Sequence, residues 1–327
     1  MACVAVIPAR RAEWSIAATL ESLRIGNHEF VERVLVVTSV DDPTADVVRR
    51  WAARDGRVEL LAFPAPLSAG AARNAGRAAI ATGAAGSRPM ETGAAGSRPM
   101  ETGAAAPLLL FIDADCSLEA GGAARLAGEL ARRGAAAVCA RVLTGGGAVA
   151  RTRHILEFKE AASRRAAPRN WLPPSTAMMC RADAFDGAGG FPDLWPGEDL
   201  VFSQALRDLG ELVQRSDEVA VVHRHPRGVG EMLRHQRRLG LTAAIARRSR
   251  RMPGSAFARN RWRAALLLPA RGVRIAAWQA REGGAALGWA LLLSPLLAGG
   301  LVAWTFGFIA GAGTASAPDR LGRATCA

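Results

Sequence analysis

Two carboxylates stand one residue apart at the end of an apolar run. The stretch "LLLFIDADC" covers 108–116, and its apolar part is typical of a strand buried on both faces. Side chains two apart on a strand point the same way, so Asp113 and Asp115 should project together from its carboxyl end, the edge of an α/β sheet where ligands bind. Adjacent carboxylates repel unless a cation or protons neutralise them, and oxygen ligands with open positions suit Mg²⁺ or Mn²⁺ bridging to a diphosphate. The alternative is that Asp115 or Ser117 caps a following helix.

A second acidic pair, Glu198 and Asp199, follows a turn that contains glycine and proline and precedes an amphipathic run. A carboxylate in such a place can take the proton of a reacting hydroxyl. The alternative for Glu198 is an acid that complements the dipole of a helix N-terminus. His223 and His225 fall on one face at the end of "EVAVVH" and its continuation. His223 could complete a metal shell, and the alternative is a hydrogen-bonded loop histidine.

The elements that would position these residues alternate along the first part of the chain. Strands are predicted at 3–8, 31–37, 58–63 and 108–113, and helices at 12–23, 45–56 and 68–83, with Ser68 as the last helix's N-cap. This alternation predicts an α/β fold with a mostly parallel sheet flanked by helices. The chain after 147 is less regular, and its best strand is 218–223. A perfect ten-residue duplication within 82–106 is interpreted as an inserted low-complexity surface loop.

Four motifs in this order resemble the family 2 glycosyltransferases, which have the nucleotide-sugar-binding GT-A fold. They are "VAVIPAR", "SAGAARNAGRAAIATG", "LLLFIDADC" and "GGFPDLWPGEDLVFSQAL", and the resemblance covers residues 3 to 240. It implies metal-dependent transfer of a sugar, as in a hexosyltransferase, from a UDP- or GDP-sugar to an acceptor hydroxyl, with inversion at the anomeric carbon.

The resemblance also implies roles for individual residues. Asp115 would hold the metal, Asp113 would face the ribose close to the metal, and Asp199, next to Glu198, would be the catalytic base. Pro8, at the end of the opening strand, belongs to the expected nucleotide site.

Three further positions of that nucleotide site are less firmly placed. Arg73 would approach the nucleotide or its phosphates, and its alternative is an exposed helix arginine. The nucleobase site departs from the family pattern, because the second strand runs into Thr38 and Ser39 before Asp41 and Asp42; either aspartate could hold the base or ribose. Arg238 lies in "RHQRRLG", which is similar to the Q-x-x-R-W motif of processive members without its tryptophan, and could touch the pyrophosphate.

Charge and hydropathy divide the rest of the chain. The formal net charge is +13, and fourteen arginines but one acid, Glu231, lie between Arg224 and Arg274. Residues 285–313 carry no charge and exceed the roughly 20 residues that span a bilayer. Few aromatic residues interleave with the arginines, which disfavours nucleic acid as a partner. We therefore expect a basic juxtamembrane region at 241–284, a transmembrane or re-entrant segment at 285–313 and a tail at 314–327. The alternative for the apolar segment is a buried core helix.

Together with the family resemblance, these features predict a glycosyltransferase domain at 1–240 on the cytoplasmic side of the cell (inner) membrane, acting on a membrane lipid or a lipid-linked acceptor. The start of the chain does not resemble a signal peptide, and the five cysteines show no zinc or disulfide spacing. A nucleotidyltransferase of sugar phosphates should open with a glycine-rich phosphate loop, and a dinucleotide oxidoreductase with G-x-G-x-x-G; "PARRAEW" contains no glycine. A catalytically inactive membrane-bound scaffold of the same fold is the non-enzymatic alternative.

Overall fold

The structure is a computed structural model that describes residues 3–82, 108–168, 171–225, 228–249 and 252–313. The expected repeat loop at 82–106, apart from Thr82, and the expected tail at 314–327 lie outside the described residues.

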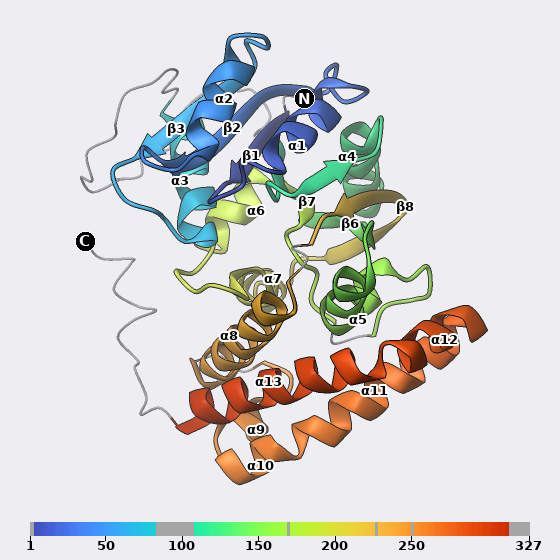
Figure 1. The fold of residues 1–327 in the computed structure, drawn as a ribbon. Coiled ribbons are helices and arrows are strands. Elements are labelled where there is room, and N and C mark those ends of the chain that lie inside the picture. Colours follow the sequence, from blue (N-terminus) through green and yellow to red (C-terminus); the bar gives the residue numbers. More distant parts are fainter. Residues whose placement is uncertain (1–2, 83–107, 169–170, 226–227, 250–251, 314–327) are drawn as a thin grey trace.

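An eight-stranded sheet forms the centre of the molecule, with the strand order β3-β2-β1-β4-β7-β6-β8-β5 (Figure 1). The strands are β1 (Cys3–Pro8), β2 (Val31–Ser39), β3 (Val58–Phe63), β4 (Leu108–Ile112), β5 (Cys116–Leu118), β6 (Ala137–Thr144), β7 (Ala177–Arg181) and β8 (Val213–His223). The strands from β3 to β4 are parallel, and β6 is parallel to β8. β7 runs antiparallel to both of its neighbours, and β5 is antiparallel to β8.

Helices cover both faces of the sheet because successive strand residues point to opposite sides. The first group is α1 (Ile16–Arg24), α2 (Thr44–Ala52) and α4 (Gly122–Arg133), and its apolar residues share one core with alternate strand residues such as Leu110 and Ile112. The second group is α3 (Ala69–Ala81), α6 (Ala182–Gly187) and α7 (Glu198–Asp208), whose core includes Leu109 and Phe111.

The predicted α/β class is therefore confirmed. Each strand and helix expected before residue 113 is present, and Ser68 caps α3 by accepting a hydrogen bond from Ala71 N at 3.2 Å. The sequence pattern did not show β5, β6 or β7, although the β8 region was expected. β7 enters the centre of a largely parallel sheet in the opposite direction, and local periodicity carries no information about strand direction.

The C-terminal part of the chain forms a layer of helices at the end of the molecule opposite β1, β2 and β3 (Figure 1). These helices are α8 (Val229–Ser249), α9 (Ser255–Ala258), α10 (Arg261–Ala265), α11 (Leu267–Glu282), α12 (Gly284–Leu292) and α13 (Ser294–Gly313). α5 (Ala148–Ala162) connects this layer to the sheet, because Ile155 and Leu156 share an apolar cluster with residues of α11, α12 and α13. α8 continues through the predicted domain boundary at 240, so the division of the chain at that residue stays a prediction.

The apolar run expected at 285–313 is divided between α12 and α13, with Pro295 in the first turn of α13, where proline is tolerated. α13 is long and apolar enough to cross a membrane, but half of its most apolar window is buried inside the protein. It lies along α8 at close range: a Cβ added at Gly307 would stand 1.9 Å from Arg237 O, and one at Gly311 would stand 2.5 Å from Leu241 O. The backbone contact of these two helices therefore depends on glycine.

Candidate active site

The D-x-D segment is held at the edge of the sheet by backbone pairing. β4 ends at Ile112, and the chain turns through Asp113–Asp115 into β5, where Cys116 is paired with His223 of β8. Asp113 N donates to Thr176 O at 3.1 Å, and Arg224 N donates to Asp115 O at 2.9 Å. α4, the next helix, begins at Gly122 with Gly121 as its N-cap, so neither Asp115 nor Ser117 caps it. The capping alternative for the D-x-D motif is therefore wrong.

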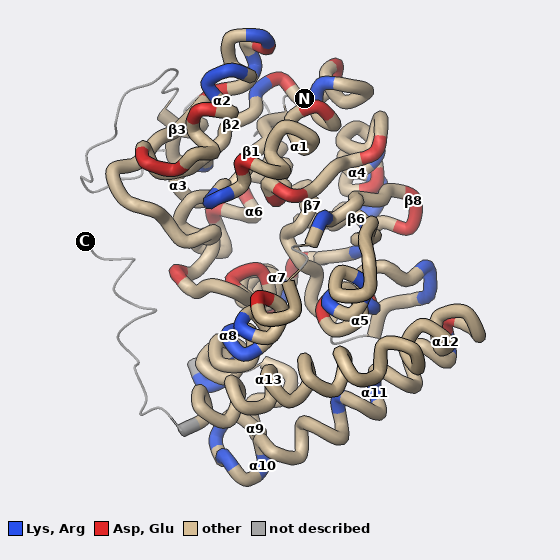
Figure 2. Tube along the Cα trace, in the orientation of Figure 1, with Lys and Arg blue, Asp and Glu red and all other residues tan. Residues whose placement is uncertain are grey.

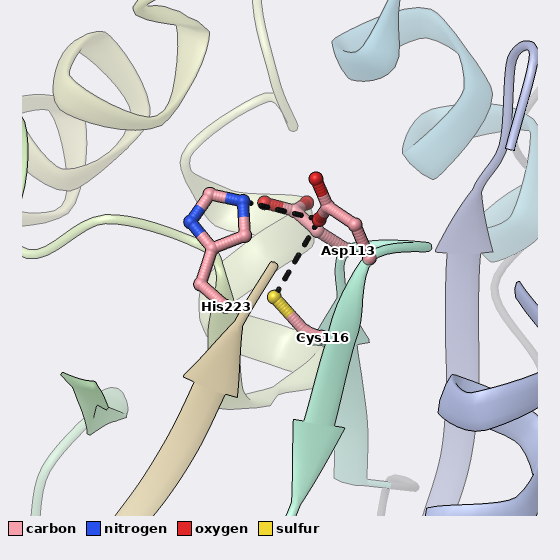
Figure 3. A group of neighbouring side chains, drawn as sticks. Asp113, Cys116 and His223 are labelled. Atoms are coloured by element: carbon pink, nitrogen blue, oxygen red, sulfur yellow. Dashed lines mark hydrogen bonds and ion pairs between the residues drawn. The ribbon is translucent and has the colours of Figure 1, made fainter. Parts of the chain in front are cut away.

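Four potential ligand atoms converge at this edge. One atom each from Asp113, Asp115, Cys116 and His223 lies within 4.8 Å of the others. The side chains of Asp113, Cys116 and His223 point toward a common centre (Figure 3). His223 Nε2 is 3.1 Å from Asp115 Oδ1, and the Cys116 thiol donates to the same oxygen at 3.7 Å. The Nδ1 atom of His223 is buried without a hydrogen-bond partner among the described residues.

These donors fit a divalent cation. Carboxylate and imidazole together suit Mn²⁺, whereas Mg²⁺ prefers oxygen alone. Although burial opposes ionisation, the neighbouring His223 imidazole holds the pKa of Asp115 below its usual range. Burial would lower the pKa of His223, but the Asp115 carboxylate raises it above the ordinary value. Each group therefore favours the charged form of the other, and a divalent cation would take the place of the imidazolium proton.

Arg73 connects the two acidic motifs. It comes from α3 and is 2% exposed, and it donates from Nη2 to Asp113 Oδ1 at 2.6 Å and from Nη1 to Glu198 Oε1 at 2.7 Å. Its guanidinium also lies over the ring of Phe191, at 5.0 Å from the centroid. Burial raises the pKa of Asp113, and the nearby Asp115 adds to this, while Arg73 opposes it. Arg73 is thus no exposed helix arginine, and its charge is already shared by two carboxylates of this chain.

Asp199 lies in the first turn of α7 and is half-buried. It directly follows Glu198, which is paired with Arg73. Its Oδ1 accepts a hydrogen bond from Leu200 N at 2.8 Å. Burial and the adjacent Glu198 carboxylate raise the pKa of Asp199 to about 7. A carboxylate with this pKa can accept a proton near neutral pH and hold it afterwards.

One cavity of about 1410 Å³ joins most of the predicted residues. Its wall includes Pro8, Arg73, Asp113, Asp115, Glu198, Asp199, His223 and Arg238. The guanidinium of Arg238 lies 4.9 Å from the ring centroid of Trp195, which lines the same cavity. The D-x-D edge and the start of α7 are far apart in sequence, and both line this cavity. The acids after β2 do not line it.

Asp41 and Asp42 are the exception. They line a neighbouring cavity of about 410 Å³ and do not line the larger one. Asp42 is buried and accepts hydrogen bonds from Arg11 N at 2.8 Å and from Thr44 N at 2.9 Å. It is partly desolvated, yet a hydrogen bond from the Thr44 hydroxyl, together with these two from the backbone, holds its pKa below the usual range. Its carboxylate therefore fixes the loop after β1 against the start of α2.

Sequence reasoning missed several residues of the large cavity. Thr38 and Ser39 line it at the end of β2, and Thr38 Oγ1 is buried with no partner among the described residues. The departure from the family pattern at these two positions was the available signal. Arg153 and Glu157 of α5 also line the cavity and form an ion pair at 3.0 Å. Their spacing of four residues was visible, but nothing in the sequence placed α5 beside the D-x-D edge.

No protein-family model and no curated protein sequence matches this chain. The chain does match solved structures. A mannosyltransferase from Pyrobaculum calidifontis, solved with GDP-mannose and Mn²⁺, is 18% identical with a TM-score of 0.59, over 94% of this chain and 86% of that one. GalNAc-T7, solved with UDP, GalNAc and Mn²⁺, is 11% identical with a TM-score of 0.50, over 76% of this chain and 50% of that one. The fold is one found in glycosyltransferases. TarS of S. aureus, solved with UDP-GlcNAc, is 12% identical with a TM-score of 0.48, over 94% of this chain and 90% of that one.

Proposed function

We propose that this protein is an inverting, metal-dependent glycosyltransferase of the family 2 type, which moves a sugar from a nucleotide-sugar donor to an acceptor hydroxyl. The observation that carries the proposal is the joint placement of a metal-type cluster and a base. Asp113, Asp115 and His223 lie on the wall of the cavity that also contains Asp199, whose pKa is raised to about 7. The fold found in glycosyltransferases supports the same reaction class.

Each residue has a task in this proposal. Asp115 and His223, with Asp113 beside them, would hold Mn²⁺ or Mg²⁺, which when bound offsets the charge of the departing diphosphate. Asp199 accepts the proton of the acceptor hydroxyl as that oxygen attacks the anomeric carbon from the face opposite the diphosphate. Arg73 ties Asp113 to Glu198 and so fixes the distance between the cluster and the base. Pro8, Thr38 and Ser39 line the part of the cavity that we assign to the UDP or GDP moiety of the donor.

Membrane association is part of the same proposal. Large apolar side chains that are exposed to solvent accumulate on the C-terminal helices: Trp262, Leu266, Val273, Trp289, Leu291, Leu292, Val302 and Phe306. Basic residues lie along α8, α10 and α11 (Figure 2). An apolar face flanked by arginines favours the headgroup layer of a membrane. We place the protein at the cytoplasmic side of the cell membrane, where nucleotide sugars are made, with a lipid or lipid-linked acceptor.

The test is hydrolysis and transfer from a panel of UDP- and GDP-sugars with and without Mn²⁺. We expect turnover that is lost with a chelator and restored by the metal, and a product of inverted anomeric configuration. Binding of Mn²⁺, followed by electron paramagnetic resonance, should be weakened in Asp115→Asn and His223→Gln. The variant Asp186→Asn, at an exposed acid of α6, is the matched control. Nucleotidyl transfer to a sugar phosphate, or no turnover with any donor, would contradict the proposal.

A further inference from the structure

The large cavity does not end at Asp199. It continues to the C-terminal helices, where its wall includes Arg247 of α8 together with Arg271 and Arg274 of α11. The same wall includes apolar side chains from these helices, namely Phe257, Leu267, Trp278, Trp304 and Phe308. The three arginines and an apolar surface therefore lie next to each other, at the end of the cavity that is away from β2.

Arg271 packs against one of these aromatic side chains. Its guanidinium carbon lies 3.8 Å from the ring centroid of Trp304. Among the described residues Arg271 forms no ion pair, and its buried Nε has no hydrogen-bond partner. Arg247 donates to two backbone carbonyls, Pro253 O at 2.8 Å and Ala243 O at 3.0 Å. Carbonyl oxygens satisfy its N–H groups but leave its positive charge unbalanced.

The acids nearby do not balance these cations. Glu160 is shared by Lys159, at 2.9 Å, and Arg274, at 3.1 Å. Glu157 is engaged by Arg153 at 3.0 Å and by His235 at 3.4 Å. Burial, together with the repulsion of neighbouring arginines, lowers the pKa of Arg271 to about 9. The same causes lower the pKa of Arg247 to about 10. Arg247 and Arg271 are half-buried, and an excess of positive charge in such a place is unfavourable unless an anion occupies it.

We propose that Arg247, Arg271 and Arg274 bind the phosphate of an amphiphilic acceptor, whose apolar chain lies against Trp304 and Phe308. Guanidinium groups match phosphate oxygens through paired hydrogen bonds. The neighbouring aromatic side chains suit an alkyl or polyprenyl chain, and α13 leads from them to the exposed apolar face. This inference rests on the proposed transferase function and names its substrate class: a lipid that carries a phosphate as well as the hydroxyl that receives the sugar.

The experiment measures binding of dodecyl phosphate to the full chain in a neutral detergent by isothermal titration calorimetry, without donor. We expect saturable binding that is at least tenfold weaker in Arg271→Gln, because a hydrogen bond to a charged group contributes roughly 1.5–3 kcal/mol and 1.4 kcal/mol is tenfold. Arg271→Lys, which keeps the charge, should recover part of the affinity. Arg263→Gln, at an exposed arginine of α10 that does not line the cavity, is the matched control and should bind as the wild type does.

Two further ligands identify the source of the phosphate. Inorganic phosphate should bind far more weakly than dodecyl phosphate. Equal affinity for the two would overturn the assignment of this site to an amphiphilic ligand. UDP or GDP with Mn²⁺ should not displace dodecyl phosphate; competition would assign the arginines to the donor's diphosphate and overturn the proposal. Equal weakening by Arg263→Gln, or no binding of dodecyl phosphate, would also overturn it. Donor hydrolysis, measured in parallel, depends on the proposed function alone, so the two failures are distinguishable.

Discussion

Arg73 is the residue on which the arrangement of the site depends most directly. A guanidinium that is 2% exposed holds two carboxylates from different elements, Asp113 and Glu198. Neither acid is paired with another cation in the described part of the chain. The three groups therefore form one unit, and each of them is unfavourable in its position without the others.

We predict that Arg73→Gln lowers the free energy of unfolding by about 3 kcal/mol or more, because it leaves two carboxylates without their cation in a buried place. The measurement is chemical denaturation in neutral detergent. Arg77→Gln is the matched control on the next turn of the same helix. Arg77 pairs with Asp186, which is half exposed, so its loss should cost less than about 1 kcal/mol. Equal effects of the two substitutions would contradict the role given to Arg73.

Asp199 gives a prediction about pH. The base must be ionised to accept a proton, and burial with the adjacent Glu198 raises its pKa to about 7. With metal and donor saturating, kcat/KM should therefore rise with pH up to about 7 and then level off. Asp199→Asn should keep donor binding but lose transfer by at least about a hundredfold, and its residual rate should lack this rise. A variant that kept the same acidic limb would show that another group titrates.

The raised pKa of Asp199 also has a consequence for stability. In the unfolded chain an aspartate ionises at about 4, whereas in the folded protein it keeps its proton to about 7. Between these values the folded state binds more protons than the unfolded state, so this group makes the protein less stable as pH rises through that range. Asp199→Asn should remove this contribution and raise stability at pH 8. Thermal melts of both proteins at pH 5 and pH 8 measure it.

At the scale of elements, glycine sets how closely α8 and α13 approach. A Cβ at Gly307 would stand 1.9 Å from Arg237 O, a distance that requires the helices to move apart. We predict that Gly307→Ala destabilises the protein by about 1–3 kcal/mol, the usual cost of overpacking. Gly288→Ala is the matched control in α12, because a Cβ there meets nothing within 4 Å. Alanine is the better helix former, so this control should be neutral or stabilising by up to about 1 kcal/mol. Thermal unfolding in detergent distinguishes the two.

The elements also show what could be predicted from the sequence. Alternating strands and helices before residue 113 follow from local periodicity, and the apposition of Asp113 and Asp115 follows from strand geometry. The antiparallel pairing of Cys116 with His223 depends on residues more than a hundred positions apart, so local patterns could not show it. His223 was nevertheless proposed, because a histidine at the end of a strand was visible. The role of Asp41 and Asp42 in holding the base or ribose stays a prediction, and a sequence cannot show that Asp42 already accepts hydrogen bonds from Arg11 N and Thr44 N.

The sequence predicted less of the structure of the C-terminal helices. Residues 285–313 have the composition of a membrane span, and composition alone cannot show that α13 has a protein partner along one side. The pairing of α13 with α8 depends on backbone contacts of glycines, which hydropathy does not measure. Likewise the composition of 241–284 predicted a basic juxtamembrane region and could not show that Arg271, within it, lies on the wall of the main cavity.

For the whole molecule, the proposed membrane association depends on how the C-terminal layer is packed. α13 packs against α8 and α5, and half of its most apolar window is buried within the protein. Lipid can therefore contact only the outer side of this layer, where Leu291, Leu292 and Phe306 are each more than 60% exposed. We infer that the helices lie in the plane of the membrane surface, with their arginines at the level of the phosphates. Truncation of this layer would expose the buried faces of α5 and α8, so substitutions at its surface are the cleaner test.

We predict that the triple variant Leu291→Gln, Leu292→Gln, Phe306→Gln binds vesicles of anionic phospholipid at least tenfold more weakly than the wild type in a sedimentation assay. Burying one such side chain contributes roughly 1.5–3 kcal/mol, so even partial immersion of three exceeds the 1.4 kcal/mol that a tenfold change requires. Ile25→Gln with Leu209→Gln, at exposed apolar positions beside the sheet, is the control and should bind normally. Alkaline carbonate should release the wild type from membranes, because in this orientation none of the described helices would be surrounded by lipid. Protein that resists carbonate, or a triple variant that binds as the wild type does, would show instead that α13 leaves α8 and crosses the bilayer.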